Sequence, residues 1–103
     1  MRAKSRFMLV ALPALLGAPL AWGQADALQV RSWAAACSNC HGTGGVALPG
    51  MESLAGASKA DLVRKLMDFK SGSRPATIMH QIAKGYGDEQ LEQIAGYFAA
   101  QKK

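Results

Sequence analysis

Residues that bind metals or form cross-links are scarce in this sequence, which has two cysteines and two histidines among 103 residues. A structural zinc site normally takes four protein ligands, so a zinc protein would need all four of these side chains. The sequence also has no stretch that alternates apolar and polar residues as a half-buried strand does. At this length the chain forms one small domain at most, which excludes a two-domain enzyme.

The sequence also lacks an apolar run of the length that crosses a bilayer, which is about 20 residues. Its longest apolar stretch, residues 7–21, is shorter and is broken by Pro13 and Pro19. Basic residues precede this stretch and small residues follow it: Arg2, Lys4 and Arg6, and then Gly23-Gln24-Ala25. The pattern predicts a signal peptide over residues 1–25 that directs export to the periplasm, with a retained membrane anchor as the alternative.

Much of the positive charge of the chain lies in this leader. Lys and Arg outnumber Asp and Glu by 12 to 7, and three of the 12 basic residues fall within residues 1–25. The remaining domain, residues 26–103, is only weakly basic, so we expect no nucleic-acid partner and no stable membrane insertion after processing. A domain this short usually needs a disulfide, a metal or a cofactor to stabilise its core.

Both cysteines lie in one motif, Cys37-Ser38-Asn39-Cys40-His41, which has the Cys-x-x-Cys-His pattern of covalent c-type haem attachment. Two thiols one helical turn apart can each add to one vinyl group of the haem, and the adjacent His41 is then held against the iron as the proximal ligand. The motif therefore predicts one haem c, attached through Cys37 and Cys40. A redox dithiol, a zinc site and a plain structural disulfide are the alternatives.

Apolar spacing and capping residues predict an all-α domain of about four short helices wrapped around the haem. Asp26 is placed to cap a first helix, whose apolar stripe includes Ala34 and continues into the haem motif. Ser58 begins a capping box for a second helix. A short helical turn is expected over residues 77–84, and Asp88 is placed to cap the last helix.

Charged residues of the second predicted helix have the spacing of ion pairs. Asp61 with Lys65, and Arg64 with Asp68, are separated by four residues and so lie on the same side of a helix. We expect both to be solvated surface pairs without a functional role.

The second axial ligand of the iron is supplied by methionine or histidine in many electron carriers. The candidates beyond the leader are Met51, Met67, Met79 and His80. Met67 belongs to the apolar face of the second helix, and Met51 is only ten residues beyond His41, a short path around the haem edge. His80 is expected to be exposed or hydrogen-bonded. Met79 follows a proline-containing loop and can approach from the opposite face, so we expect Met79 to be the distal ligand.

Four segments resemble class I cytochromes c and, more narrowly, the cytochrome subunit of flavocytochrome c sulfide dehydrogenase. They are Ala36-Cys37-Ser38-Asn39-Cys40-His41-Gly42, Ser53-Leu54-Ala55-Gly56, Phe69-Lys70-Ser71-Gly72 and Thr77-Ile78-Met79-His80-Gln81-Ile82-Ala83-Lys84-Gly85-Tyr86. The resemblance implies that Met79 is the distal ligand and that the first and last helices cross with Ala35 facing Gly96. The best-known members of the narrower family carry two haem domains, whereas this sequence has one Cys-x-x-Cys-His motif.

The resemblance implies a periplasmic carrier of single electrons. With His41 and Met79 on the iron, no axial position is open for a substrate, so the chain itself is expected to catalyse no reaction. The family implies a FAD-containing partner subunit that oxidises sulfide and passes electrons to this haem, and a downstream acceptor such as another cytochrome. A free-standing carrier similar to cytochrome c-553 and a haem-free dithiol protein are the two alternatives.

Overall fold

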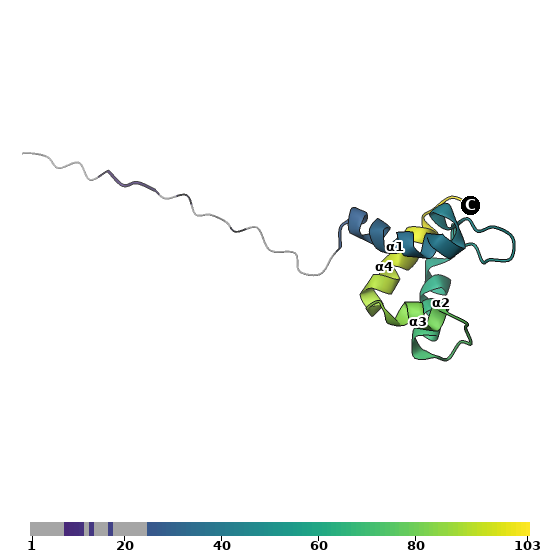
Figure 1. The fold of residues 1–103 in the computed structure, drawn as a ribbon. Coiled ribbons are helices and arrows are strands. Elements are labelled where there is room, and N and C mark those ends of the chain that lie inside the picture. Colours follow the sequence, from purple (N-terminus) through teal and green to yellow (C-terminus); the bar gives the residue numbers. More distant parts are fainter. Residues whose placement is uncertain (1–7, 12, 14–16, 18–24) are drawn as a thin grey trace, which may run out of the picture.

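The structure, a computed structural model, describes residues 8–11, 13, 17 and 25–103. Residues 25–103, the longest described part, are all-α, in agreement with the prediction. Figure 1 shows how the helices are arranged. The elements are α1 (Ala27–His41), the 3₁₀ turn η1 (Thr43–Gly45), α2 (Lys59–Ser71), α3 (Met79–Lys84) and α4 (Asp88–Ala99). The expected leader, residues 1–25, lies outside the described residues apart from positions 8–11, 13, 17 and 25, so the leader stays a prediction. Among the described residues, no helix has the length and apolar character of a membrane span.

The first two helices begin where the sequence predicts. The Asp26 carboxylate accepts a hydrogen bond from the backbone N–H of Gln29 at 2.8 Å, which caps α1. The Ser58 hydroxyl accepts one from the backbone N–H of Asp61 at 3.4 Å, which caps α2. Each cap satisfies one of the N–H groups that a helix start leaves without a partner, so these two starts are determined by nearby sequence.

The starts of α3 and α4 differ from the prediction. Helix α3 begins at Met79 instead of Thr77, and no side chain caps it. Helix α4 is capped by Gly87, one residue before the expected cap, because the Gln90 side chain accepts a hydrogen bond from the Gly87 N–H at 2.8 Å. Asp88 is therefore the first helical residue, where its negative charge is favourable to the helix dipole.

The core forms where α4 packs against α1 and α2, and Figure 1 shows α1 and α4 crossing. Its buried residues are Ala34, Leu62, Ile94, Ala95 and Phe98. Ala35 is exposed, and the side chain nearest to Gly96 is that of Lys59, so the expected contact between Ala35 and Gly96 is wrong. The buried residues are instead Ala34 and Ala95, each one position before a residue of the expected pair. Successive residues of a helix point about 100° apart, so a shift of one position moves the contact to another side of the helix.

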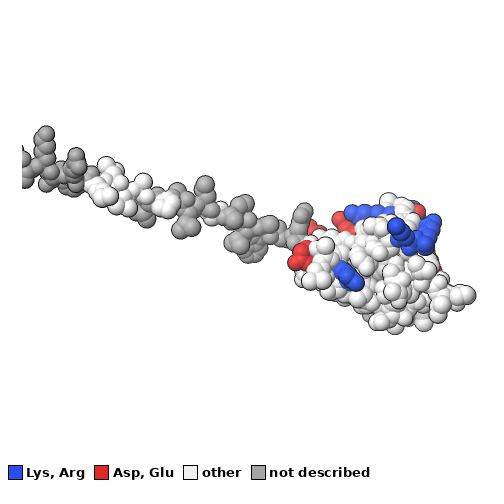
Figure 2. Space-filling model, turned by 90° about the horizontal axis from the view of Figure 1, so that it is seen from above, with Lys and Arg blue, Asp and Glu red and all other residues white. Residues whose placement is uncertain are grey.

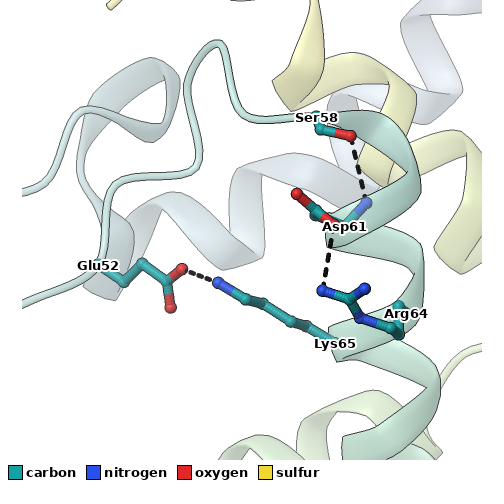
Figure 3. Close-up of polar contacts among 5 residues, drawn as sticks. All are labelled: Glu52, Ser58, Asp61, Arg64 and Lys65. Carbon is teal, nitrogen blue, oxygen red and sulfur yellow. Dashed lines mark hydrogen bonds and ion pairs between the residues drawn. The ribbon is translucent and has the colours of Figure 1, made fainter.

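The charged residues of α2 form pairs other than the expected ones (Figure 3). Arg64 pairs with Asp61, three residues before it, at 3.1 Å. Lys65 pairs with Glu52, which lies in the loop before α2. The prediction of partners four residues apart is wrong because this loop returns beside α2 and brings a closer carboxylate to Lys65.

The surface charges are unevenly distributed. On the face seen in Figure 2, Lys and Arg side chains gather toward one part of the domain, and most of the remaining surface is uncharged. Large apolar side chains contribute to the exposed surface, including Val46 and Leu48, which are 50% and 80% exposed. The domain therefore presents apolar as well as charged areas to its surroundings.

Candidate functional site

A cavity of about 260 Å³, partly open to the surface, is lined by residues of α1, α2, α3 and α4 together with the loop before α2. Most of the residues that line it are apolar, among them Leu62, Phe69, Ile94 and Phe98. Its polar or sulfhydryl lining consists of Cys37, Cys40, His41, Glu52 and Lys65. The cavity thus joins a largely apolar wall with a small number of groups that can bind a ligand.

The volume of this cavity is large for so small a domain. The cavity therefore fits a large apolar group that completes the core.

The structure brings the four predicted site residues to this one cavity. Cys37, Cys40 and His41 lie in the last turns of α1, and Met79 is the first residue of α3. Residues three and four positions apart share one side of a helix, which is why the motif presents both thiols and the imidazole together. Met51 also lines the cavity, although the sequence analysis favoured Met79 over Met51 as the distal ligand.

The two remaining candidates for the distal position lie elsewhere. Neither Met67 nor His80 belongs to the cavity lining. His80 is half-buried, and its Nδ1 atom is buried without a hydrogen-bond partner among the described residues. His80 therefore stays partly exposed, and its Nδ1 makes none of the expected hydrogen bonds among the described residues.

The orientation of the His41 ring is fixed by a hydrogen bond. Its Nδ1 lies 2.6 Å from the backbone carbonyl oxygen of Glu52. A carbonyl oxygen can only accept, so Nδ1 carries the proton and Nε2 keeps its lone pair for a metal. No sequence pattern predicts this contact, because the two residues are eleven positions apart and the loop between them has no regular pattern.

The chain turns sharply directly after His41. Gly42 has φ 86° and ψ 160°, and its N–H donates to the Ser38 carbonyl at 3.0 Å. A Cβ atom at this position would lie 1.8 Å from the Val46 carbonyl oxygen. Glycine is therefore required for the chain to leave α1 and pass close to the following loop.

The two cysteines are not joined in a disulfide. Cys37 is half-buried, and burial raises the pKa of its thiol, partly offset by a hydrogen bond from the backbone. A redox-active dithiol needs the opposite, a lowered pKa that makes the attacking thiolate available near neutral pH. The environment of Cys37 therefore disfavours the dithiol alternative.

No protein-family model matches the chain. Cytochrome c-553 of Helicobacter pylori is 35% identical to it over 78 residues, which cover 74% of this chain and 81% of that protein. The chain belongs to the cytochrome c family. Its all-helical architecture is the class I cytochrome c fold, and membership implies a covalently bound haem c.

The alignments with two further relatives of this cytochrome cover smaller shares of those proteins. The cytochrome subunit of sulfide dehydrogenase from Chlorobaculum tepidum is 44% identical over 62 residues, which cover 60% of this chain and 56% of that protein. Cytochrome c4 of Pseudomonas aeruginosa is 36% identical over 97 residues, which cover 92% of this chain and 48% of that protein. The chain thus spans about half the length of these two relatives.

Proposed function

We propose that this cytochrome carries single electrons on one haem c, attached through Cys37 and Cys40, with His41 and Met79 as the axial ligands. The observation that supports this proposal is the convergence of these four side chains on one apolar cavity from two separate helices. A bound haem supplies reversible one-electron chemistry, and the protein controls its potential through the ligands and their surroundings.

The ligand set and the lining both favour the reduced iron. A thioether ligand such as Met79 raises the potential compared with a second histidine. Apolar residues such as Leu66 and Phe69 line much of the cavity. Because the oxidised centre carries one more positive charge, a poorly solvating environment disfavours it.

The electron donor that we propose is a FAD-containing subunit that oxidises sulfide and forms a heterodimer with this chain. Similarity to the cytochrome subunit of a sulfide dehydrogenase supports this partner. Three residues of the cavity lining are also exposed, Met51 by 47%, Ile78 by 60% and Ile82 by 36%, and they provide an apolar surface beside the haem site. Residues 1–25 would direct export, so that the domain of residues 26–103 works in the periplasm.

One experiment tests the partner directly. The chain carrying an affinity tag is purified from its host, and the eluate is analysed for flavin fluorescence and for haem reduction by sulfide. We expect a larger flavoprotein to copurify and sulfide to reduce the haem only when that protein is present. Two results together would contradict this partner. The chain would be recovered as a flavin-free monomer, and sulfide would fail to reduce its haem even after the host flavoprotein fraction is added back.

A diffusible carrier that moves electrons between respiratory complexes is the second candidate. The supporting observation is that the alignment with cytochrome c-553 covers 81% of that protein, so the two are of similar size. A monomer that unrelated reductases reduce equally well would favour this role. A pyridine haemochrome spectrum without a c-type signal would contradict both candidates.

The axial assignment has its own prediction. Replacing Met79 with alanine should abolish the weak far-red sulfur-to-iron band of the oxidised protein and lower the potential, because a thioether ligand is lost. Met51→Ala is the matched control, since Met51 lines the same cavity and should leave the band in place. Survival of the band in Met79→Ala together with its loss in Met51→Ala would reverse the assignment.

A further inference from the structure

Glu52 connects the His41 ring to helix α2. Its backbone carbonyl accepts the hydrogen bond from His41 Nδ1 at 2.6 Å, and its carboxylate pairs with Lys65 Nζ on α2. Figure 3 shows the Lys65 side chain reaching from the helix to the loop that carries Glu52. Glu52 and Lys65 both line the cavity, so the link lies beside the proposed haem site.

The segment around Glu52 has few other attachments. Residues 48–53 are all exposed. Within the described part of the chain, the other hydrogen bonds of this segment are local: Met51 N–H to the Leu48 carbonyl at 3.2 Å and Ala47 N–H to the Ser53 hydroxyl at 2.9 Å. Directly after this segment, the N–H groups of Leu54 and Ala55 both donate to the Gly45 carbonyl, at 2.8 and 3.1 Å. Between this anchor and Leu48, the ion pair with Lys65 ties Glu52 to α2.

We propose that the Glu52–Lys65 ion pair is a positioning pair, which holds the Glu52 carbonyl against His41 and thereby sets the strength of the imidazole as an iron ligand. The inference rests on the proposed function, in which His41 binds the haem iron. An imidazole that donates its Nδ1 proton to a carbonyl becomes more basic at the other nitrogen. A more basic ligand stabilises the oxidised iron, so breaking the pair should raise the reduction potential.

The direct effect of the two charges must be separated from this positioning effect. Through its charge alone, Glu52→Gln would raise the potential and Lys65→Gln would lower it, because they remove charges of opposite sign. Through positioning, both substitutions raise it. The double variant Glu52→Gln/Lys65→Gln leaves the net charge unchanged, so the shift that remains reports the position of the carbonyl.

A matched control exists on the same helix. Asp61 and Arg64 form an ion pair at 3.1 Å with side chains 56% and 65% exposed, and neither residue lines the cavity (Figure 3). The double variant Asp61→Asn/Arg64→Gln also breaks one ion pair without changing the net charge. It should leave His41 undisturbed.

The experiment uses the haem-loaded protein and two readouts. Redox titration gives the potential, and NMR gives the solvent exchange rate of the His41 Nδ1 proton. In Glu52→Gln/Lys65→Gln we expect a raised potential and about two- to fivefold faster exchange, the range expected for the loss of a partly exposed ion pair. The charge-swapped variant Glu52→Lys/Lys65→Glu should return both values toward wild type, and the Asp61/Arg64 control should change neither.

The outcomes distinguish this inference from the proposed function. A pyridine haemochrome assay on each sample reports haem attachment separately, and a wild-type protein without haem c would refute the proposed function and this inference together. A haem-loaded double variant with unchanged potential and unchanged proton exchange would refute the positioning role alone. Opposite shifts in the two single variants that cancel in the double variant would also refute it.

Discussion

Replacing Gly42 by alanine tests how the chain turns away from the haem motif. The backbone of Gly42, at φ 86° and ψ 160°, lies in a region that glycine alone adopts readily, and a residue strained in this way costs about 1–3 kcal/mol. The added Cβ would also lie 1.8 Å from the Val46 carbonyl oxygen and 2.6 Å from its carbon. Backbone atoms must move to relieve that overlap, so we expect Gly42→Ala to lower the free energy of unfolding by more than about 3 kcal/mol.

Gly44→Ala is the control for this substitution. Gly44 also has a positive φ, 65°, but a Cβ there meets no atom within 4 Å, so its cost is the backbone strain alone, about 1–2 kcal/mol. Urea unfolding followed by circular dichroism measures both. With a slope of about 1 kcal/mol/M for so small a domain, Gly42→Ala should lower the midpoint by at least about 1 M more than Gly44→Ala does. Equal losses in the two variants would refute the close approach of Gly42 and Val46.

Three further substitutions test the packing and the helix ends. Phe98→Ala removes a ring that is 1% exposed and should cost about 3–5 kcal/mol in urea unfolding; a loss below about 1 kcal/mol would contradict its place in the core. Lys70→Met removes two hydrogen bonds of 2.8 Å, one to the Tyr86 carbonyl and one to the Asp88 carboxylate. The backbone amides of α3 should then exchange with solvent about tenfold faster. Unchanged amide exchange would count against a role of these two hydrogen bonds in holding α3. Asp26→Ala should cost about 1 kcal/mol by removing the α1 cap, whereas Asp26→Asn should retain most of the stability; equal losses would argue against the cap.

The features that the sequence predicted correctly depend on neighbouring residues. The caps at Asp26 and Ser58 act within three positions, and the spacing of Cys37, Cys40 and His41 is that of a single helix. Such signals are contained in a short window, so they can be read without knowledge of the fold. The same holds for the all-α class, because each helix carries its own apolar pattern.

The features that the sequence did not predict depend on which segments meet. The pairing of Lys65 with Glu52 follows from the path of the loop, which no helical spacing encodes. The choice between Ala34 and Ala35 at the crossing with α4 depends on how that helix is rotated against α1. The presence of both Met51 and Met79 in the cavity lining is likewise a consequence of how the loop folds back.

The two sides of the cavity are held to the domain with unequal strength. On one side, α1 has 15 residues and a capped start, whereas on the other α3 has six residues and no side-chain cap. A helix of six residues is unstable by itself, so its position depends on contacts with α2. Local opening should therefore begin at α3 at a lower free energy than unfolding of the whole domain. On warming, the Met79 side of the cavity should loosen first, while the side built from α1 persists to higher temperature.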